Sequence, residues 1–167
     1  MSGAYLPPCP ILPRHSLTGF DSGKPELDDW LKARAIGSEG KSARTIVITD
    51  AAGAVVAYRS LATGHTLREE VPGKIRHNLP RMVPLIILAR LAVDKSHHGK
   101  GLGSSLLKDA FQRTVQMSEI AGVRALIVHA IDEAAVDFYR RYGFEIFPQG
   151  TRTLIMPIET VIKATGV

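Results

Sequence analysis

Residues 88–104 read LARLAVDKSHHGKGLGS, and this stretch decides how the rest of the chain is interpreted. It overlaps an apolar run, residues 83–93 (VPLIILARLAV), whose content of Val, Ile and Leu is typical of a buried strand. Glycines then occur at three alternate positions, Gly99, Gly101 and Gly103, and a helical pattern follows. Glycine lets the backbone turn tightly and approach a ligand, and a helix start offers unpaired N–H groups and a positive dipole end. The order strand, glycine loop, helix predicts either a pyrophosphate site or only a tight connection.

The spacing of the glycines excludes two common phosphate loops. The dinucleotide-binding pattern G-x-G-x-x-G is not met, because Ser104 and Leu106 stand where further glycines would be needed. The P-loop motif is absent as well. Lys100 adds a positive charge inside the loop. We therefore interpret this loop as a different kind of pyrophosphate-binding turn.

Composition is that of a soluble globular protein. A chain of 167 residues is expected to fold as a single domain, residues 1–167, with a sizeable core. The excess of 21 Lys and Arg over 16 Asp and Glu favours polyanionic partners, a nucleotide cofactor or a nucleic acid. The single cysteine, Cys9, suits a reducing compartment. No signal segment, membrane span or metal site is predicted, so we expect a cytoplasmic protein.

The first half of the chain combines a proline-rich start, a helix and a hairpin. Residues 1–13 carry four prolines and are expected to form a loose arm, or an edge strand at most. Pro25 suits a helix first turn. The apolar residues Leu27, Trp30, Leu31 and Ala35 then recur at helical spacing, which makes Trp30 a core anchor. Residues 44–50 and 55–63 are predicted as two strands of a hairpin.

Residues 64–84 fit neither the helical nor the strand period. Within this segment Lys74, Arg76 and Arg81 supply three positive charges, and no acid lies between Lys74 and Arg81. The segment is either a solvated surface loop or a patch that follows nucleic-acid phosphates without reading sequence.

The second half alternates helices with short strands. The helix after the glycine loop presents one apolar face, Leu102, Leu106, Leu107, Ala110, Phe111, Thr114 and Val115, and ends before Gly122. Residues 125–130 (ALIVHA) predict a buried strand. Asp132 is a suitable N-cap for the next helix, and Gly143 fits its C-terminal end. Two closing strands are expected at residues 144–147 and 154–158.

The glycine loop and the last helix together resemble the Gcn5-related N-acetyltransferase (GNAT) family. The matching residues are Leu91-Ala92-Val93, the loop His98-Gly99-Lys100-Gly101-Leu102-Gly103, and residues 138–144 (FYRRYGF). The resemblance implies an α/β (α+β) fold with a central mixed, mostly antiparallel twisted sheet flanked by helices. It also implies acetyl-CoA as the acetyl donor, bound where parallel strands splay apart.

The resemblance assigns the acetyl-CoA contacts residue by residue. Backbone N–H groups of the loop would bind the pyrophosphate, and the backbone of Leu91 and Val93, with Ala92 between them, would pair with the pantetheine arm and the thioester carbonyl. The loop residues given this role are His98, Gly99, Lys100, Gly101, Leu102, Gly103 and Ser104. Because His98 replaces the Gln or Arg usual in the family, CoA binding is expected to weaken as pH rises. Asp132 replaces a common Asn and is predicted only to cap its helix.

Tyr139 is the predicted catalytic residue. An amine must attack the thioester, an oxyanion must be stabilised, and a proton must reach the leaving sulfur. A phenol with a pKa near 10 suits that last step. The alternative is that Tyr139 only packs in an aromatic cluster with Phe138 and Tyr142. No general base is obvious, which fits an α-amino acceptor, with a pKa of about 7.7–8.0, better than a lysine.

A narrower resemblance covers nearly the whole chain. Residues 27–31 (LDDWL), 42–45 (SART), 88–94 (LARLAVD) and 129–135 (HAIDEAA) are similar to the acetyltransferase toxins of type II toxin–antitoxin pairs. Those toxins acetylate the amino acid on charged tRNA and block translation. They are restrained by a ribbon-helix-helix antitoxin and are often homodimers, so the resemblance implies an aminoacyl-tRNA substrate, such an antitoxin and a homodimer here.

The RNA-binding residues expected on this basis are Lys74, Arg76, Arg81 and Arg90. Arg90 lies on the central strand and either pairs with a buried acid or faces the substrate; we favour the second, because unpaired burial is costly. Two other functions stay open: an acetyltransferase for a small-molecule or protein amine, and an acyl-CoA-binding module without turnover. The basic loop argues against cationic small acceptors, and the presence of Tyr139 argues against the silent module.

Overall fold

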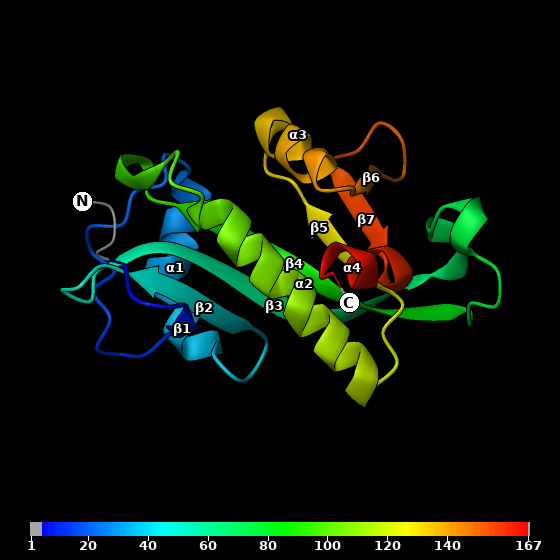
Figure 1. Ribbon diagram of the computed structural model, residues 1–167, viewed down its shortest axis with the longest axis horizontal. Helices are drawn as coiled ribbons and strands as arrows, with labels where there is room; N and C mark the ends of the chain where they lie inside the picture. Colours follow the sequence, from blue (N-terminus) through cyan, green and yellow to red (C-terminus); the bar gives the residue numbers. More distant parts are fainter. Residues whose placement is uncertain (1–4, 167) are drawn as a thin grey trace. The chain divides into compact units, whose positions relative to one another are not determined.

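The computed structural model describes residues 5–166, which group into two compact units. Unit 1 holds the described residues up to 62 together with 89–109, and unit 2 holds residues 63–88 together with those from 110 onward. Seven strands of the described residues form one sheet in the order β1-β2-β3-β4-β5-β7-β6 (Figure 1). Among these residues, no helix is both long enough and apolar enough to cross a membrane.

The element order confirms the predicted mixed, mostly antiparallel fold. The strands are β1 (Cys9–Pro10), β2 (Arg44–Thr49), β3 (Val55–Leu67), β4 (Met82–Val93), β5 (Ala125–His129), β6 (Glu145–Ile146) and β7 (Thr153–Pro157). The helices are α1 (Pro25–Ser38), α2 (Leu102–Ile120), α3 (Glu133–Arg141) and α4 (Ile158–Ala164). β4 and β5 pair in parallel, whereas β1 with β2, β2 with β3, and β7 with both β5 and β6 pair antiparallel.

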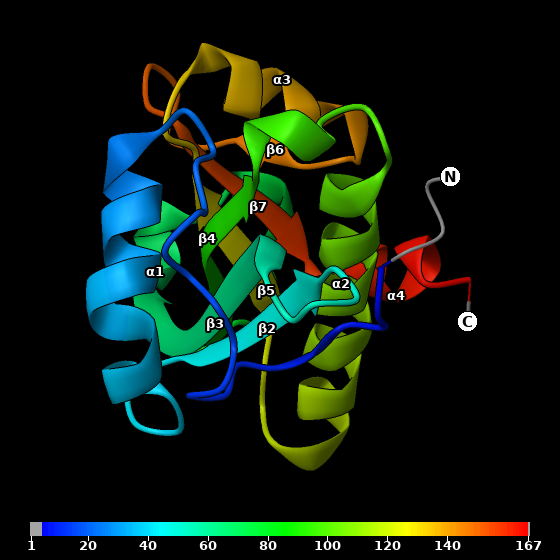
Figure 2. The same ribbon diagram turned by 90° about the vertical axis from the view of Figure 1, so that its left-hand side faces the viewer.

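In unit 1 a helix covers each face of the strands. α1 begins at Pro25 as predicted, and its buried face packs on one side of β2 and β3, whereas the start of α2 packs on the other side (Figure 2). The first core comprises Ile11, Phe20, Leu31, Ala35, Val47, Val55, Tyr58 and Ala92. The second comprises Ile48, Val56, Ala57, Leu102 and Leu106. In β2 the neighbouring residues Val47 and Ile48 face the first and the second core, whereas the adjacent Val56 and Ala57 of β3 both face the second core, next to an irregularity in the β2–β3 register.

Part of the proline-rich start forms a short edge strand. Cys9–Pro10 pairs with β2, and the N–H of Ile11 donates to the carbonyl of Thr45 at 3.0 Å. Ile11 is buried in the first core. Burial of this side chain, together with the backbone bonds, holds the segment against the sheet. Residues 1–4 of the expected arm lie outside the described residues.

A buried ion pair ties β3 to α2 within unit 1. The Arg59 side chain is 2% exposed, and its guanidinium donates to the carboxylate of Asp109. The same guanidinium contacts the carbonyl of Arg44 at 3.4 Å. Since charges inside a core are costly unless they are paired, this contact favours close packing of the first half of α2 against β3.

In unit 2 a third core lies between strands β4, β5 and β7 and the loop that precedes β4. Its buried members are Val71, Leu79, Val83, Leu85, Ala125 and Ile155. α3 contacts β7, and α4 contacts both β5 and β7. The caps predicted for α3 are confirmed: the N–H of Ala135 donates to Asp132 at 2.9 Å, and Gly143 adopts a left-handed φ of +102° after the helix.

The segment predicted to lack regular structure is largely ordered. β3 continues through it to Leu67, and short 3-10 turns at Arg68–Glu70 and Gly73–Ile75 lead to β4. Gly64 packs closely on β4, because a Cβ there would lie 2.6 Å from the Cδ1 of Ile87, so that flexible side chain would have to shift.

Candidate functional site

The glycine loop has the backbone that its sequence predicts. Gly99 and Gly101 both adopt a left-handed φ of +78°, which disfavours any residue with a side chain. A Cβ at either position would meet no atom within 4 Å, so open space faces the loop. Gly103 lies in the first turn of α2, and the N–H of Ser105 donates to the carbonyl of Gly101 at 3.0 Å. Open space, left-handed glycines and a helix start fit the pyrophosphate of acetyl-CoA.

Asp94 anchors the chain just before this loop. Its carboxylate accepts the N–H of Ser96 at 2.9 Å and the N–H of Asp21 at 3.0 Å. Its own N–H donates to the carbonyl of Val56 at 2.8 Å. We did not identify Asp94 from the sequence, although an acid directly after a buried strand is a signal for such a loop anchor.

His98 contacts the strand that precedes the loop. Its Nε2 lies 2.8 Å from the carbonyl of Val93, and since a carbonyl only accepts, Nε2 carries the proton. The ring is exposed.

The strand segment predicted to hold the pantetheine arm lies at the end of β4. Ala92 is buried in the first core, whereas Leu91 and Val93 are half-buried against the second core. One backbone acceptor of this segment, the Val93 carbonyl, already accepts a hydrogen bond from Nε2 of His98.

Tyr139 is buried in unit 2 with its ring among aromatic neighbours. It is 5% exposed and meets Phe138 and Phe144 edge to face at centroid distances of 5.3 and 5.5 Å. Burial raises the pKa of Tyr139 well above its usual value, so the phenol is protonated at physiological pH. Within residues 5–166 its hydroxyl makes no hydrogen bond. The aromatic cluster weighed as an alternative is present.

The basic loop is only partly available to an RNA. Lys74 forms an exposed ion pair with Glu145. Arg76 donates to the carbonyls of Val71 and Glu69 at 2.9 and 2.7 Å, so it holds its own loop together. Arg81 is exposed, and its side chain has no partner among the described residues. Of the three predicted contacts in this loop, Arg81 fits best.

Arg90 packs on an aromatic ring rather than on an acid. Its guanidinium carbon lies 4.0 Å from the centroid of the Trp30 ring, and burial lowers the pKa of Arg90. No carboxylate pairs with it within the described part of the chain. Of the two alternatives for Arg90, the structure therefore does not contain the pair with a buried acid. Trp30 is half-buried, so it both anchors the core and faces outward.

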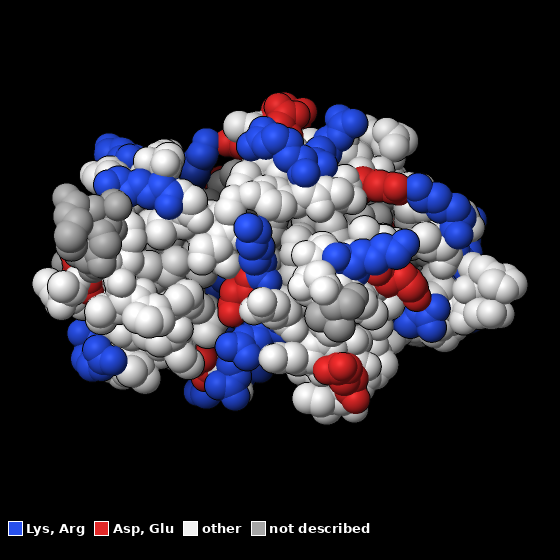
Figure 3. Space-filling view, in the orientation of Figure 1, with Lys and Arg blue, Asp and Glu red and all other residues white. Residues whose placement is uncertain are grey.

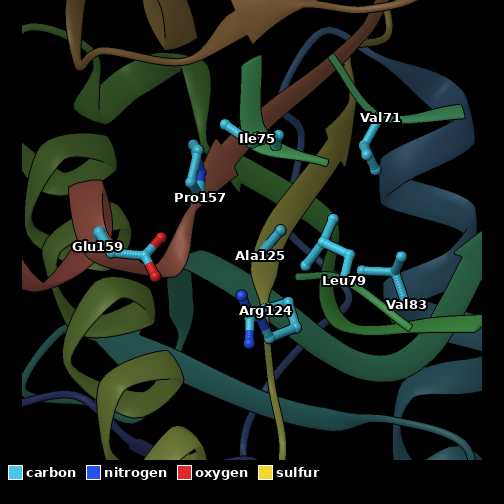
Figure 4. Close-up of a pocket in the computed structure, with 8 residues that line it drawn as sticks. All are labelled: Val71, Ile75, Leu79, Val83, Arg124, Ala125, Pro157 and Glu159. Atoms are coloured by element: carbon cyan, nitrogen blue, oxygen red, sulfur yellow. The ribbon is translucent and has the colours of Figure 1, made fainter. Parts of the chain in front are cut away.

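Other features of the described residues do not form a second site. A hollow in unit 2 is lined by Val71, Ile75, Leu79, Val83, Arg124, Ala125, Pro157 and Glu159, none of which the sequence predicted as functional (Figure 4). Lys and Arg side chains occur in several separate groups on the face in Figure 3, with acidic ones between them. No group of His, Cys, Asp or Glu in residues 5–166 could hold a metal ion.

The sequence of this chain matches a known protein family. A family model described as "Acetyltransferase (GNAT) domain" matches residues 41–146, which include the glycine loop and Tyr139. The chain belongs to the GNAT acetyltransferases. It is an N-acetyltransferase, and acetyl-CoA is its acetyl donor.

Individual GNAT relatives extend the match over most of the chain. A "tRNA-acetylating toxin" of Mycobacterium tuberculosis (strain ATCC 25618 / H37Rv) is 43% identical over 148 residues, 89% of each chain. The structure of AtaT complexed with acetyl-methionyl-tRNAfMet is 24% identical, with a TM-score of 0.86 over 94% of this chain and 97% of that one. A tyrosine-to-phenylalanine mutant of AtaT, bound to the C-terminus of the antitoxin AtaR and acetyl-CoA, is 21% identical, with a TM-score of 0.80 over 95% and 96%. At these identities the two AtaT structures show the shared fold.

Proposed function

We propose that this chain is a type II toxin that acetylates the α-amino group of aminoacyl-tRNA and thereby blocks translation. The observation that carries the proposal is the 43% identity to a tRNA-acetylating toxin over 89% of both chains. An aminoacyl ester suits a site without an evident base, since an α-amino group has a useful neutral fraction near pH 7.

Different residues act in the successive steps of the acetyl transfer. Backbone N–H groups of residues 98–104 hold the pyrophosphate, and the backbone of Leu91 to Val93 aligns the thioester. The acceptor amine attacks the thioester carbon, a C–N bond forms, and an N–H at Leu91 or Val93 stabilises the oxyanion. The C–S bond then breaks, and Tyr139 donates its phenolic proton to the sulfur. The proton lost by the acetylated nitrogen restores the phenol.

Several finer features belong to the same proposal. We assign RNA contacts to Lys74, Arg76, Arg81 and Arg90, with Arg81 and Arg90 the strongest of the four. Unit 1 and unit 2 act as one acetyltransferase domain over residues 1–167. The partner is a ribbon-helix-helix antitoxin, the toxin is a homodimer, and its charged tRNA substrate places it in the cytoplasm.

The deciding experiment offers the protein labelled acetyl-CoA with charged tRNA, uncharged tRNA or a lysine peptide. Label on charged tRNA alone, released together with the amino acid by mild ester hydrolysis, is the expected result. Label on the peptide would favour a general amine acetyltransferase. Label on none of the three, with CoA still bound, would favour the binding module, and either outcome overturns the proposal.

Replacement of Arg81 by Gln is expected to lower kcat/KM for charged tRNA about 3- to 10-fold at low salt. One lost phosphate contact should also reduce the slope of log kcat/KM against log salt by roughly one. Arg152→Gln is the matched control, because this exposed arginine is not among the assigned RNA contacts and already pairs with Glu133. If the two variants behave alike, Arg81 is not an RNA contact.

A further inference from the structure

We propose that Arg90, held against Trp30, binds a phosphodiester at the 3′ end of the acceptor RNA, and that Trp30 is the positioning residue for this contact. The inference rests on the proposed function and specifies how the aminoacyl end of the substrate is held. Trp30 was expected from the sequence to be a core anchor.

The Trp30 ring, on which Arg90 lies, is itself held in place by Tyr58. Trp30 stacks on Tyr58 with an interplanar angle of 13° and a centroid distance of 6.0 Å. Tyr58 is fully buried, and its hydroxyl donates to the carbonyl of Leu27 at 2.7 Å. This bond ties the stack to the first turn of α1. The indole is thus a rigid surface on which the planar guanidinium lies, at 4.0 Å from the ring centroid.

The charge of Arg90 is left without a protein counterion. The nearby carboxylate of Asp28 accepts both the N–H of Ser22 at 3.0 Å and its hydroxyl at 2.6 Å. No carboxylate in residues 5–166 pairs with Arg90, and burial disfavours its charged form. A half-buried cation without a partner is costly unless a ligand supplies the negative charge. A phosphodiester does so, because its two free oxygens match the guanidinium fork.

The face of β4 on which Arg90 lies favours the acceptor over the cofactor. Arg90 contacts Trp30 of α1, and Ala92 packs in the core on that same side. Leu91 and Val93 instead pack with Leu102 and Leu106 at the start of α2, directly after the glycine loop. Successive strand residues point to opposite faces and lie about 3.3 Å apart. Arg90 can therefore hold the RNA from the α1 face, one residue from the proposed oxyanion N–H, without competing with the CoA phosphates.

A pair of acceptors isolates the phosphodiester contact. Charged tRNA carries phosphodiesters next to its aminoacyl end, whereas 3′-O-aminoacyl adenosine has the same amine and ester without any phosphate. Arg90→Gln is expected to lower kcat/KM for charged tRNA about 10-fold or more, mainly through KM, and to change that for the nucleoside less than 2-fold. Trp30→Leu should lower kcat/KM for charged tRNA about 3- to 10-fold, and Trp30→Phe should restore most of it.

Two controls distinguish positioning from damage to the fold. The KM for acetyl-CoA and the thermal melting temperature should match those of the parent protein for Arg90→Gln and Trp30→Phe, which keep most of the packing volume. Equal losses with both acceptors, or no loss with charged tRNA, would overturn this inference alone. A parent protein that does not acetylate charged tRNA would overturn the proposed function, and this inference with it.

Discussion

Tyr139→Phe is expected to lower kcat about 100- to 10,000-fold while leaving the affinity for acetyl-CoA unchanged. The substitution removes one oxygen from a ring that is otherwise held by Phe138 and Phe144, so packing is kept and the proton donor is lost. Without that donor the sulfur leaves as an unprotonated thiolate. Single-turnover rates with charged tRNA measure the effect on chemistry apart from product release.

The pH profile gives an independent check on Tyr139. Because burial raises the pKa of Tyr139, the phenol keeps its proton throughout the range in which the acceptor amine becomes neutral. The rate should therefore rise with pH as the amine loses its proton, without a decline below about pH 10 from loss of the phenolic proton.

The matched control for Tyr139 is Tyr142→Phe, which removes a hydroxyl just beyond the same helix and should keep kcat within a few-fold of the parent value. If Tyr139→Phe retained a third or more of the parent kcat, the role of general acid would be wrong. The residue would then serve the aromatic cluster only.

Asp109→Leu is expected to lower the free energy of unfolding by about 3–5 kcal/mol. The Arg59 side chain is 2% exposed and Asp109 is 17% exposed, so removal of the carboxylate leaves a charge in the core that water cannot reach. Urea unfolding, followed by circular dichroism, measures the change in midpoint.

A double variant separates the cost of the unpaired charge from lost packing. Arg59→Met together with Asp109→Leu replaces both charges by apolar groups of similar size and should recover most of the stability. Lys95→Gln, which breaks the exposed pair with Asp21, should leave the midpoint nearly unchanged. A single Asp109→Leu variant as stable as the parent protein would contradict this account.

Short sequence patterns predicted the helix ends, because a helix end depends on a few adjacent residues. Pro25 marks the start of α1, and Asp132 and Gly143 delimit α3. α4 was missed: residues 158–164 follow directly on an apolar strand, and Ile158 was assigned to that strand. The end of β3 was missed too, since residues 63–67 (TGHTL) show no alternation of polar and apolar side chains.

The residues of the candidate site also differ in how far the sequence alone could predict them. The glycine loop and Tyr139 could be identified from the sequence, since each sits in a short motif with its own backbone requirement. The state of the charges could not. Whether Lys74 is free depends on Glu145, and whether Arg90 faces a substrate depends on Trp30, and each partner is remote along the chain. The sequence shows which residues carry charge, and only the fold shows which charges are already engaged.

A contact of Tyr5, at the start of the described residues, bears on how the protein should be prepared. The Tyr5 hydroxyl lies 2.6 Å from Nδ1 of His97, and the two rings meet edge to face at 5.4 Å. His97 closes the 3-10 turn that leads into the glycine loop. An affinity tag fused upstream of Tyr5 would be attached close to this contact. Kinetic and CoA-binding measurements should therefore use a cleavable N-terminal tag that has been removed, or a tag at the other end of the chain.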